Sequence, residues 1–423
     1  MTSEVALLNK SAIALAADSA TTVTYYEKNE HKTRYFKGAN KVFNLSRVHP
    51  VGVMTFASAS LSGVPWEIII KSYRAHLGKN SHDRLSEYAA DFFNFIESNS
   101  LLFPLDVQEK QFIALADRAA AQLLLPVTNT DHYATANPAT KSQIVLDALH
   151  AREQALPNVG FIPAANQQDI DDAVTKHLGL VTAHFRADPY YIAFVPDSEM
   201  ERAAKIGIAG VFKLDLEGQG TTGLAFAGFG ESEYFPKLEQ YRCYGLILGK
   251  SYVHKEQEVT IDHAQSAEVV PLAQSNMIDT FVHGASFPTM KVVHRFFVKR
   301  FDELESEMKA TGLIPANADL GALKQRAEEE FTREVTAYYF TEHRRPLARV
   351  IANLPINELA ELAETLVYIE SLKERVTTPE ETVSGPIDVA VISKHDGFIW
   401  IKRKHYFKPE LNYRFFFNQQ REV

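Results

Sequence analysis

Apolar residues near the start of the chain fall in two short runs, residues 5–8 and 12–16, separated by Asn9, Lys10 and Ser11. Short apolar runs divided by a few turn-forming residues are typical of antiparallel strands joined by a tight turn. This pattern predicts a hairpin that begins almost at the first residue.

Two further strands are predicted at residues 42–45 and 51–56, after a polar stretch at 25–40. A helix should follow them, because Pro65 suits the first helical position and four apolar residues then fall on one helical face. These residues are Trp66, Ile69, Ile70 and Tyr73. From 81 to 209 the pattern is mostly helical.

The second half of the chain repeats this alternation. Short apolar runs predict strands at residues 211–216, 223–227, 240–248 and 259–261, and a charged helical region follows at 276–341. A last helix is marked by apolar residues at spacings of three, four and three, namely Leu359, Leu362, Leu366 and Ile369. Residues 387–392 and 398–401 predict a closing hairpin. The order favours an α+β protein in which helices cover antiparallel sheets.

Length and charge narrow the classes of protein. The chain has 423 residues, more than the ~250–300 at which single cores stop growing, so two domains or one decorated domain are expected. The net charge of −9 gives no general attraction to nucleic acid. No segment has the roughly 18 uninterrupted apolar residues of a membrane span, and Glu4 and Lys10 contradict a secretory signal. A single cysteine, Cys243, excludes an intrachain disulfide and fits a reducing compartment, so a cytoplasmic protein is expected.

The sequence contains no cofactor-binding motif in the structural context that such a motif needs. Gly218, Gly220 and Gly223 match a dinucleotide fingerprint, but an apolar strand is predicted after them where that site needs a helix. The 15 histidines form no metal-binding motif. We therefore expect no metal and no cofactor.

The start of the chain carries a different chemistry. Met1 precedes Thr2, a small residue that permits methionine removal, so the mature chain would begin with a threonine. Its hydroxyl is a nucleophile, and its α-amine, with an ordinary pKa of about 7.7–8.0, is a base close to neutrality. The hydroxyl also needs a nearby cation to favour its anionic form, and a carboxylate must hold that cation.

A carboxylate and a lysine follow Thr2 at the ends of predicted strands. Asp18 and Ser19 close the second predicted strand, 16 residues after Thr2, and Lys41 directly precedes the third. This order resembles the threonine hydrolases of the N-terminal-nucleophile fold, the proteasome β subunits and the bacterial HslV-type peptidases. The resemblance implies that Thr2 is the nucleophile, Lys41 its charge partner and Asp18 the anchor of Lys41.

Four more positions follow from the same resemblance. Ala57 falls where the family has the oxyanion-hole glycine; its N–H would donate, while its Cβ restricts the backbone. Glu381 and Ser384 match the acidic-x-x-Ser-Gly segment that supports the terminal amine, with glutamate in place of aspartate. Gln274 and Ser275 both fit the position of the second supporting serine, and Ser275 is the prediction.

The resemblance implies a four-layer αββα sandwich of two antiparallel sheets with large helical insertions, in a single domain of residues 1–423. The core segments would be 1–77, 211–286 and 354–406, with helical insertions at 78–210 and 287–353. The implied activity is cleavage of peptide or amide bonds by a homo-oligomer, with any ATPase partner unidentified. The alternative is a catalytically inactive, proteasome-like assembly or binding protein, because Ala57 departs from the family pattern.

Overall fold

The computed structural model describes residues 3–27, 30–216, 220–377 and 385–414. Within them the chain is an α+β protein with two five-stranded antiparallel sheets. The first sheet has the order β12 (Ala267–Pro271), β1 (Glu4–Asn9), β2 (Ala12–Ala17), β13 (Asp388–Ser393) and β14 (Gly397–Lys402). The second has the order β11 (Lys250–Thr260), β10 (Lys237–Ile247), β9 (Thr222–Gly228), β6 (Val51–Ala57) and β5 (Val42–Asn44).

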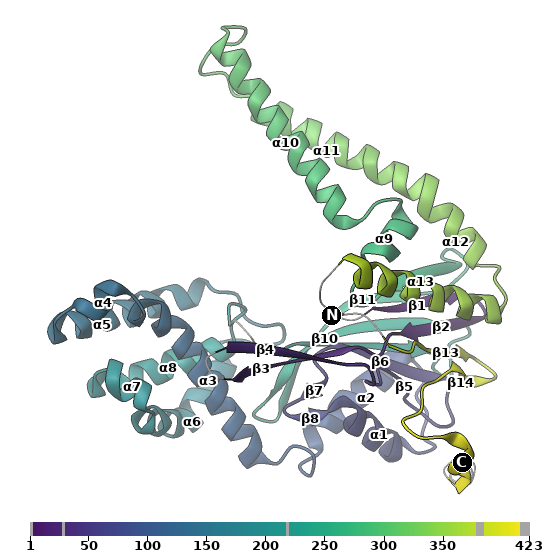
Figure 1. The fold of residues 1–423 in the computed structure, drawn as a ribbon, viewed down its shortest axis with the longest axis horizontal. Coiled ribbons are helices and arrows are strands. Elements are labelled where there is room, and N and C mark those ends of the chain that lie inside the picture. The colour runs from purple at the N-terminus through teal and green to yellow at the C-terminus, as the bar shows by residue number, and fades with distance from the viewer. Residues whose placement is uncertain (1–2, 28–29, 217–219, 378–384, 415–423) are drawn as a thin grey trace.

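The two sheets pack face to face, and helices cover their outer faces (Figure 1). Side chains of β1 show the arrangement, because alternate residues of a strand point to opposite faces. Val5 and Leu7 pack against α13 (Ile356–Thr377), whereas Ala6 and Leu8 pack between the sheets. Since both faces of β1 and β2 are covered, these strands are apolar without alternation.

Each outer face has its own pair of helices. The first sheet is covered by α13 and α9 (Asn276–His283), and the second by α1 (Trp66–Leu77) and α2 (Leu85–Ser98). The helix α2 falls inside the first expected insertion, yet it packs on the second sheet and belongs to this layer.

The remaining helices of that insertion form a lobe with its own apolar core beside the second sheet (Figure 1). They are α3 (Leu105–Thr128), α4 (Asp131–Thr135), α5 (Pro138–Ala155), α6 (Gln167–Ala187), α7 (Pro189–Phe194) and α8 (Met200–Val211), with short 3₁₀ turns η1 (Leu156–Asn158) and η2 (Asp197–Glu199).

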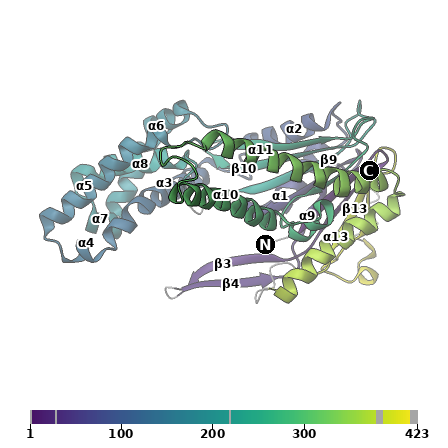
Figure 2. The same cartoon turned by 90° about the horizontal axis from the view of Figure 1, so that it is seen from above.

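Two long features project from the body. The helices α10 (Phe287–Ala310) and α11 (Gly321–Tyr338) form a hairpin, which returns through a π-helical turn, η3 (Tyr339–Arg344), to α12 (Arg345–Ile351) (Figure 1). The strands β3 (Thr21–Glu27) and β4 (Glu30–Phe36) form a separate ribbon, which Figure 2 shows extending along one side. Shorter elements are β7 (Ser60–Leu61), β8 (Val64–Pro65) and the 3₁₀ turn η4 (Pro409–Leu411).

Most predicted elements are present, with four differences. Residues 211–216 are not a strand: α8 continues through Val211, and only Lys213 forms an isolated bridge, to Phe161. The polar stretch at 25–40 contains most of the β3–β4 ribbon.

The other two differences concern boundaries. Residues 259–261 were expected as a short strand, but they include only the end of the eleven-residue β11. Pro65 precedes α1 as its N-cap and is not its first residue. No helix in the described ranges is long and apolar enough to cross a membrane.

Candidate active site

A buried ion pair lies where the first sheet meets the start of the second. Asp18 directly follows β2 and Lys41 directly precedes β5, and Lys41 Nζ donates to Asp18 Oδ1 at 2.6 Å. Asp18 is 1% exposed and Lys41 is 6% exposed. Burying both charges is costly unless their geometry is good and other hydrogen bonds complete it, so this pair is held by a specific local structure.

Backbone groups supply that structure. Ser3 N–H donates to Asp18 Oδ1 at 3.0 Å, and Asp18 N–H donates to Ser3 O at 3.1 Å. Ala20 N–H donates to Asp18 Oδ2 at 3.1 Å, while Lys41 O accepts from Thr55 N–H at 2.9 Å. The carboxylate therefore links the lysine to Ser3, the residue that follows Thr2 in the sequence.

Ala57 ends β6 in an unusual backbone conformation. Its φ is +68°, in the left-handed region where glycine is favoured, and its side chain is exposed. β6 pairs with β9 up to this point, so Ala57 lies opposite Thr222. Ala57 thus has a backbone conformation that glycine adopts without strain, at the position where the sequence resemblance led us to expect a glycine.

Ser275 lies in the segment between β12 and α9. β12 pairs with β1 from Val5 opposite Pro271, and Leu272 N–H donates to Glu4 O at 3.0 Å, so the residues after Leu272 run past the start of β1. Ser275 precedes α9, and its hydroxyl donates to Asp279 Oδ2 at 2.9 Å.

Gln274, the other candidate for that position, is tied to a different element. Its side-chain amide donates to Glu374 Oε1 at 2.6 Å, and Glu370 Oε2 accepts from Met277 N–H at 2.7 Å. Both glutamates are buried residues of α13, and burial raises the pKa of Glu370.

Sequence reasoning missed these two glutamates, although a signal was present. The buried face of α13 runs through Ala363 and Val367 at a spacing of four, and Glu370 and Glu374 continue it at spacings of three and four. Acidic residues on an otherwise apolar helical face indicate buried carboxylates that need partners. Their partners lie about 100 residues earlier in the sequence, so only the folded chain identifies them.

Three predicted site residues, Thr2, Glu381 and Ser384, lie outside the described residues. The glycine that follows Ser384 is described. Gly385 has a φ of +93°, and a Cβ placed on it would lie 3.4 Å from Ser19 Cβ. Ser19 Oγ in turn donates to Pro386 O at 2.5 Å. The chain just after Ser384 is therefore held beside the Asp18–Ser19 turn.

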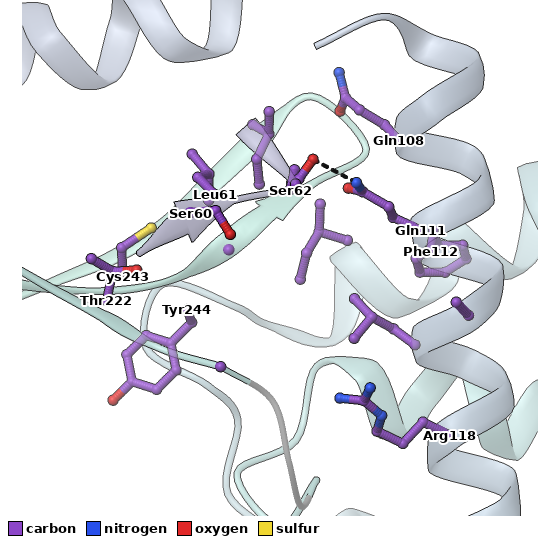
Figure 3. Close-up of a pocket in the computed structure, with 17 residues that line it drawn as sticks. Ser60, Leu61, Ser62, Gln108, Gln111, Phe112, Arg118, Thr222, Cys243 and Tyr244 are labelled. Carbon is purple, nitrogen blue, oxygen red and sulfur yellow. Dashed lines mark hydrogen bonds between the residues drawn. The ribbon is translucent and has the colours of Figure 1, made fainter. Parts of the chain in front are cut away.

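A cavity of about 280 Å³ opens a few residues beyond Ala57 (Figure 3). Ser60 and Ser62 line one side and residues of α3 line the other, where Gln111 Nε2 donates to Ser62 O at 2.7 Å. Cys243 also lines it but is 2% exposed, and burial raises its thiol pKa to about 11. A thiol in this state is a poor nucleophile.

Other chemistries find little support in the described part of the chain. No group of three or more His, Cys, Asp and Glu side chains there has the arrangement to hold a metal ion. Gly223 lies inside β9, so a strand follows the glycine-rich segment as predicted and no helix N-terminus is available to a dinucleotide phosphate.

The sequence matches no family model and no curated protein. Among solved structures, the chain is similar to an Anbu (Gly-1) mutant from Hyphomicrobium sp. strain MC1. The sequence identity is 10% and the TM-score is 0.30, over 100% of this chain and 94% of that chain. A likeness at this level carries no weight for fold or activity, whereas the contacts of Asp18, Lys41 and Ala57 come from this chain itself.

Proposed function

We propose that the protein is a threonine hydrolase that cleaves peptide or amide bonds with Thr2 as its nucleophile, after removal of Met1. The observation that carries this proposal is the buried Asp18–Lys41 pair, whose carboxylate also accepts a hydrogen bond from Ser3 N–H. A lysine buried with one carboxylate partner is a cation that water does not screen, which is what a developing alkoxide needs.

In the proposed reaction the α-amine of Thr2 first accepts a proton and then donates it to the leaving group. Thr2 Oγ attacks the substrate carbonyl carbon while the α-amine of Thr2 accepts the hydroxyl proton. The Ala57 N–H donates to the oxyanion, and collapse of the tetrahedral intermediate releases the leaving amine, which takes the proton from the α-amine. Water then hydrolyses the resulting ester and restores the Thr2 hydroxyl.

We also propose a domain organisation, a substrate recess and an oligomeric state for the hydrolase. We take residues 1–423 as one decorated domain whose insertions are helical. Support for a link between the cavity and Ala57 comes from the lining residue Thr222, which pairs with Ala57. The cavity is then the proposed recess for a substrate side chain. A cytoplasmic homo-oligomer acting on peptides or amides is consistent with the single cysteine and the net charge of −9.

The decisive experiment treats the untagged protein with a threonine-directed electrophile such as a β-lactone and maps the adduct by peptide mass spectrometry. We expect the adduct on Thr2, and a loss of model-amide turnover on the order of 10³-fold or more in Thr2→Ala. Thr2→Ser should keep part of the activity because it retains a hydroxyl. Thr135→Ala, which removes an exposed threonine of α4, is the control.

The alternative, an inactive assembly or binding protein, is favoured by one observation, the Cβ of Ala57 at a position of positive φ. Intact-mass measurement separates the two functions. Retained Met1, or undiminished turnover in Thr2→Ala, would contradict the hydrolase and leave the alternative.

A further inference from the structure

The N–H of Ala57 faces the side of β6 on which Lys41 lies. Backbone N–H groups along a strand point alternately towards its two neighbours. Thr55 N–H donates to Lys41 O at 2.9 Å, and Ser58 N–H donates to Thr221 O, just before β9, at 3.2 Å. Ala57 lies two residues after Thr55, so its N–H points to the same side as that of Thr55. The proposed oxyanion contact requires this direction.

The strand that would continue the pairing on this side has already ended. β5 begins at Val42. The register would place Ala39 opposite Ala57, but Ala39 N–H donates to Ser19 O at 3.1 Å, so this part of the chain joins the turn after β2. The Ala57 N–H therefore faces the turn that holds Asp18.

This orientation is coupled to the positive φ of Ala57. At +68° the alanine lies in the left-handed region, which costs an L-residue about 5- to 30-fold in population. The peptide plane between Phe56 and Ala57 can relieve this strain by rotating, because ψ of Phe56 and φ of Ala57 can turn in opposite directions while the chain on either side stays in place. The rotation turns the Ala57 N–H away from Lys41.

Two contacts with the start of β9 hold the chain that leaves Ala57. One is the bond from Ser58 N–H to Thr221 O, and in the other Thr222 Oγ1 donates to Ser58 O at 3.4 Å. The second distance is long for a hydroxyl donor, but the hydroxyl is aligned by a third group. Trp66 Nε1 donates to Thr222 Oγ1 at 3.0 Å, so the hydroxyl hydrogen must point away from the indole, and Ser58 O is its acceptor.

Trp66 is itself fixed by the core of the second sheet. It is 2% exposed and stacks on Phe92 of α2, with ring centroids 6.4 Å apart. Its backbone N–H also donates to Ala59 O at 3.1 Å. Thr222 is likewise 2% exposed, and it lies at the edge of the cavity beside Cys243 (Figure 3). The start of α1 thus sets the position of the Thr222 hydroxyl.

We propose that Thr222 is a positioning residue of the oxyanion site. Its hydroxyl, aligned by Trp66, holds the chain after Ala57 so that the Ala57 N–H stays turned towards Lys41. The hydroxyl is needed because residue 57 is an alanine, since glycine adopts a positive φ without strain. The catalytic consequence rests on the hydrolase activity proposed above, whereas the backbone geometry can be measured without turnover.

Steady-state kinetics on a model amide test the catalytic consequence. Thr222→Val removes the hydroxyl and keeps the shape of the side chain. We expect its kcat to fall about 5- to 30-fold while KM stays within about twofold, because the oxyanion forms only after attack. Thr222→Ser retains the hydroxyl and should keep most of the wild-type kcat.

A second substitution separates positioning from a general loss of structure. In the Ala57→Gly background the positive φ carries no strain, so Thr222→Val should keep most of the kcat of Ala57→Gly alone. A hydroxyl that only satisfies the indole N–H would give the same loss in both backgrounds. The control is Thr182→Val, which removes a 7% exposed threonine hydroxyl of α6 that makes no hydrogen bond within the described residues, and kcat should not change. Should Thr222→Val unfold by circular dichroism, Thr222→Cys replaces it, because a thiol is a weak donor.

Crystal structures of the variants show the backbone directly. We expect a negative φ at Ala57 in Thr222→Val and a positive φ at residue 57 when Ala57→Gly is added. A positive φ at Ala57 in Thr222→Val, or a loss of kcat that Ala57→Gly does not reduce, would overturn the proposal. Failure of the hydrolase itself would appear separately, as a wild type without an adduct on Thr2, and the φ at residue 57 would still decide whether Thr222 holds this peptide.

Discussion

Replacing Asp18 with asparagine removes one charge from a fully enclosed group. The carboxylate accepts from Lys41 Nζ at 2.6 Å and from Ser3 N–H at 3.0 Å through Oδ1, and from Ala20 N–H at 3.1 Å through Oδ2. An asparagine has one acceptor oxygen, so its NH₂ group must face at least one of these donors. Lys41, at 6% exposure, would then keep a buried charge without its counter-ion.

The expected cost is large for a marginally stable fold. Breaking a buried ion pair by removing one partner costs about 3–5 kcal/mol, because the remaining charge stays desolvated. Total stabilities are about 5–15 kcal/mol, so Asp18→Asn should lower the unfolding midpoint markedly. Removing both charges with Asp18→Asn and Lys41→Met should recover part of that loss.

The measurement is a double-mutant cycle by urea denaturation at fixed protein concentration. We expect a coupling energy of about 1–3 kcal/mol for Asp18 and Lys41. The control cycle is on Lys205 and Glu201, an exposed pair at 2.9 Å on α8, which should couple by less than about 0.5 kcal/mol. Additive single-mutant costs at Asp18 and Lys41 would show that the pair does not hold this region together, and the electrostatic argument for the nucleophile would lose its support.

Three smaller perturbations test other parts of the structure. Ala57→Gly should leave stability unchanged or raise it by up to about 1 kcal/mol, because φ is +68°, whereas Ala57→Val should lower it; thermal unfolding that favours valine would refute this. Burial raises the pKa of Glu370 above its ordinary 4.5, so the folded state loses stability as pH rises through that window. Glu370→Gln should therefore melt higher than the wild type at pH 8 and equally below about pH 4, while its amide oxygen can still accept from Met277 N–H; a gap that is constant with pH would contradict the buried charge. Cys243, with its thiol pKa raised to about 11 by burial, should resist iodoacetamide at pH 8 until urea unfolds the chain, and rapid native labelling in an intact-mass assay would disprove its burial.

Several strands of the two sheets could be predicted because they are short apolar runs, whereas the largely polar β11 was recognised only at its end. β1, β2 and β13 are buried at every position. A strand buried on both faces needs apolar residues throughout, so it can be recognised in the sequence as an apolar run between turn residues. The same rule failed at 211–216, where Val211 ends α8 and the apolar residues that follow it belong to irregular chain with one isolated bridge at Lys213. It also missed the β3–β4 ribbon, which is held by backbone pairing and carries no apolar alternation.

The candidate site was less accessible to sequence reasoning. Asp18 and Lys41 were paired through a family resemblance, and their separation of 23 residues alone gives no sign that they meet. Glu370 and Glu374 were missed because their partners come from the packing of α13 on α9. Contacts between side chains far apart in sequence depend on the complete set of layers, which local patterns do not encode.

The central position of the first hairpin determines when its sheet can be completed during synthesis. β1 and β2 lie in the middle of their sheet, between β12 and β13, and Asn9 Nδ2 donates to the carbonyl of Ile351 at 3.1 Å. β13 follows β2 by about 370 residues, which a ribosome adds in roughly 20–75 s at 5–20 residues per second. For that time two of the most apolar strands have no finished sheet to enter. The pairing of β2 with β13 and the contact of Ser19 with Pro386 can therefore form only after synthesis is nearly finished.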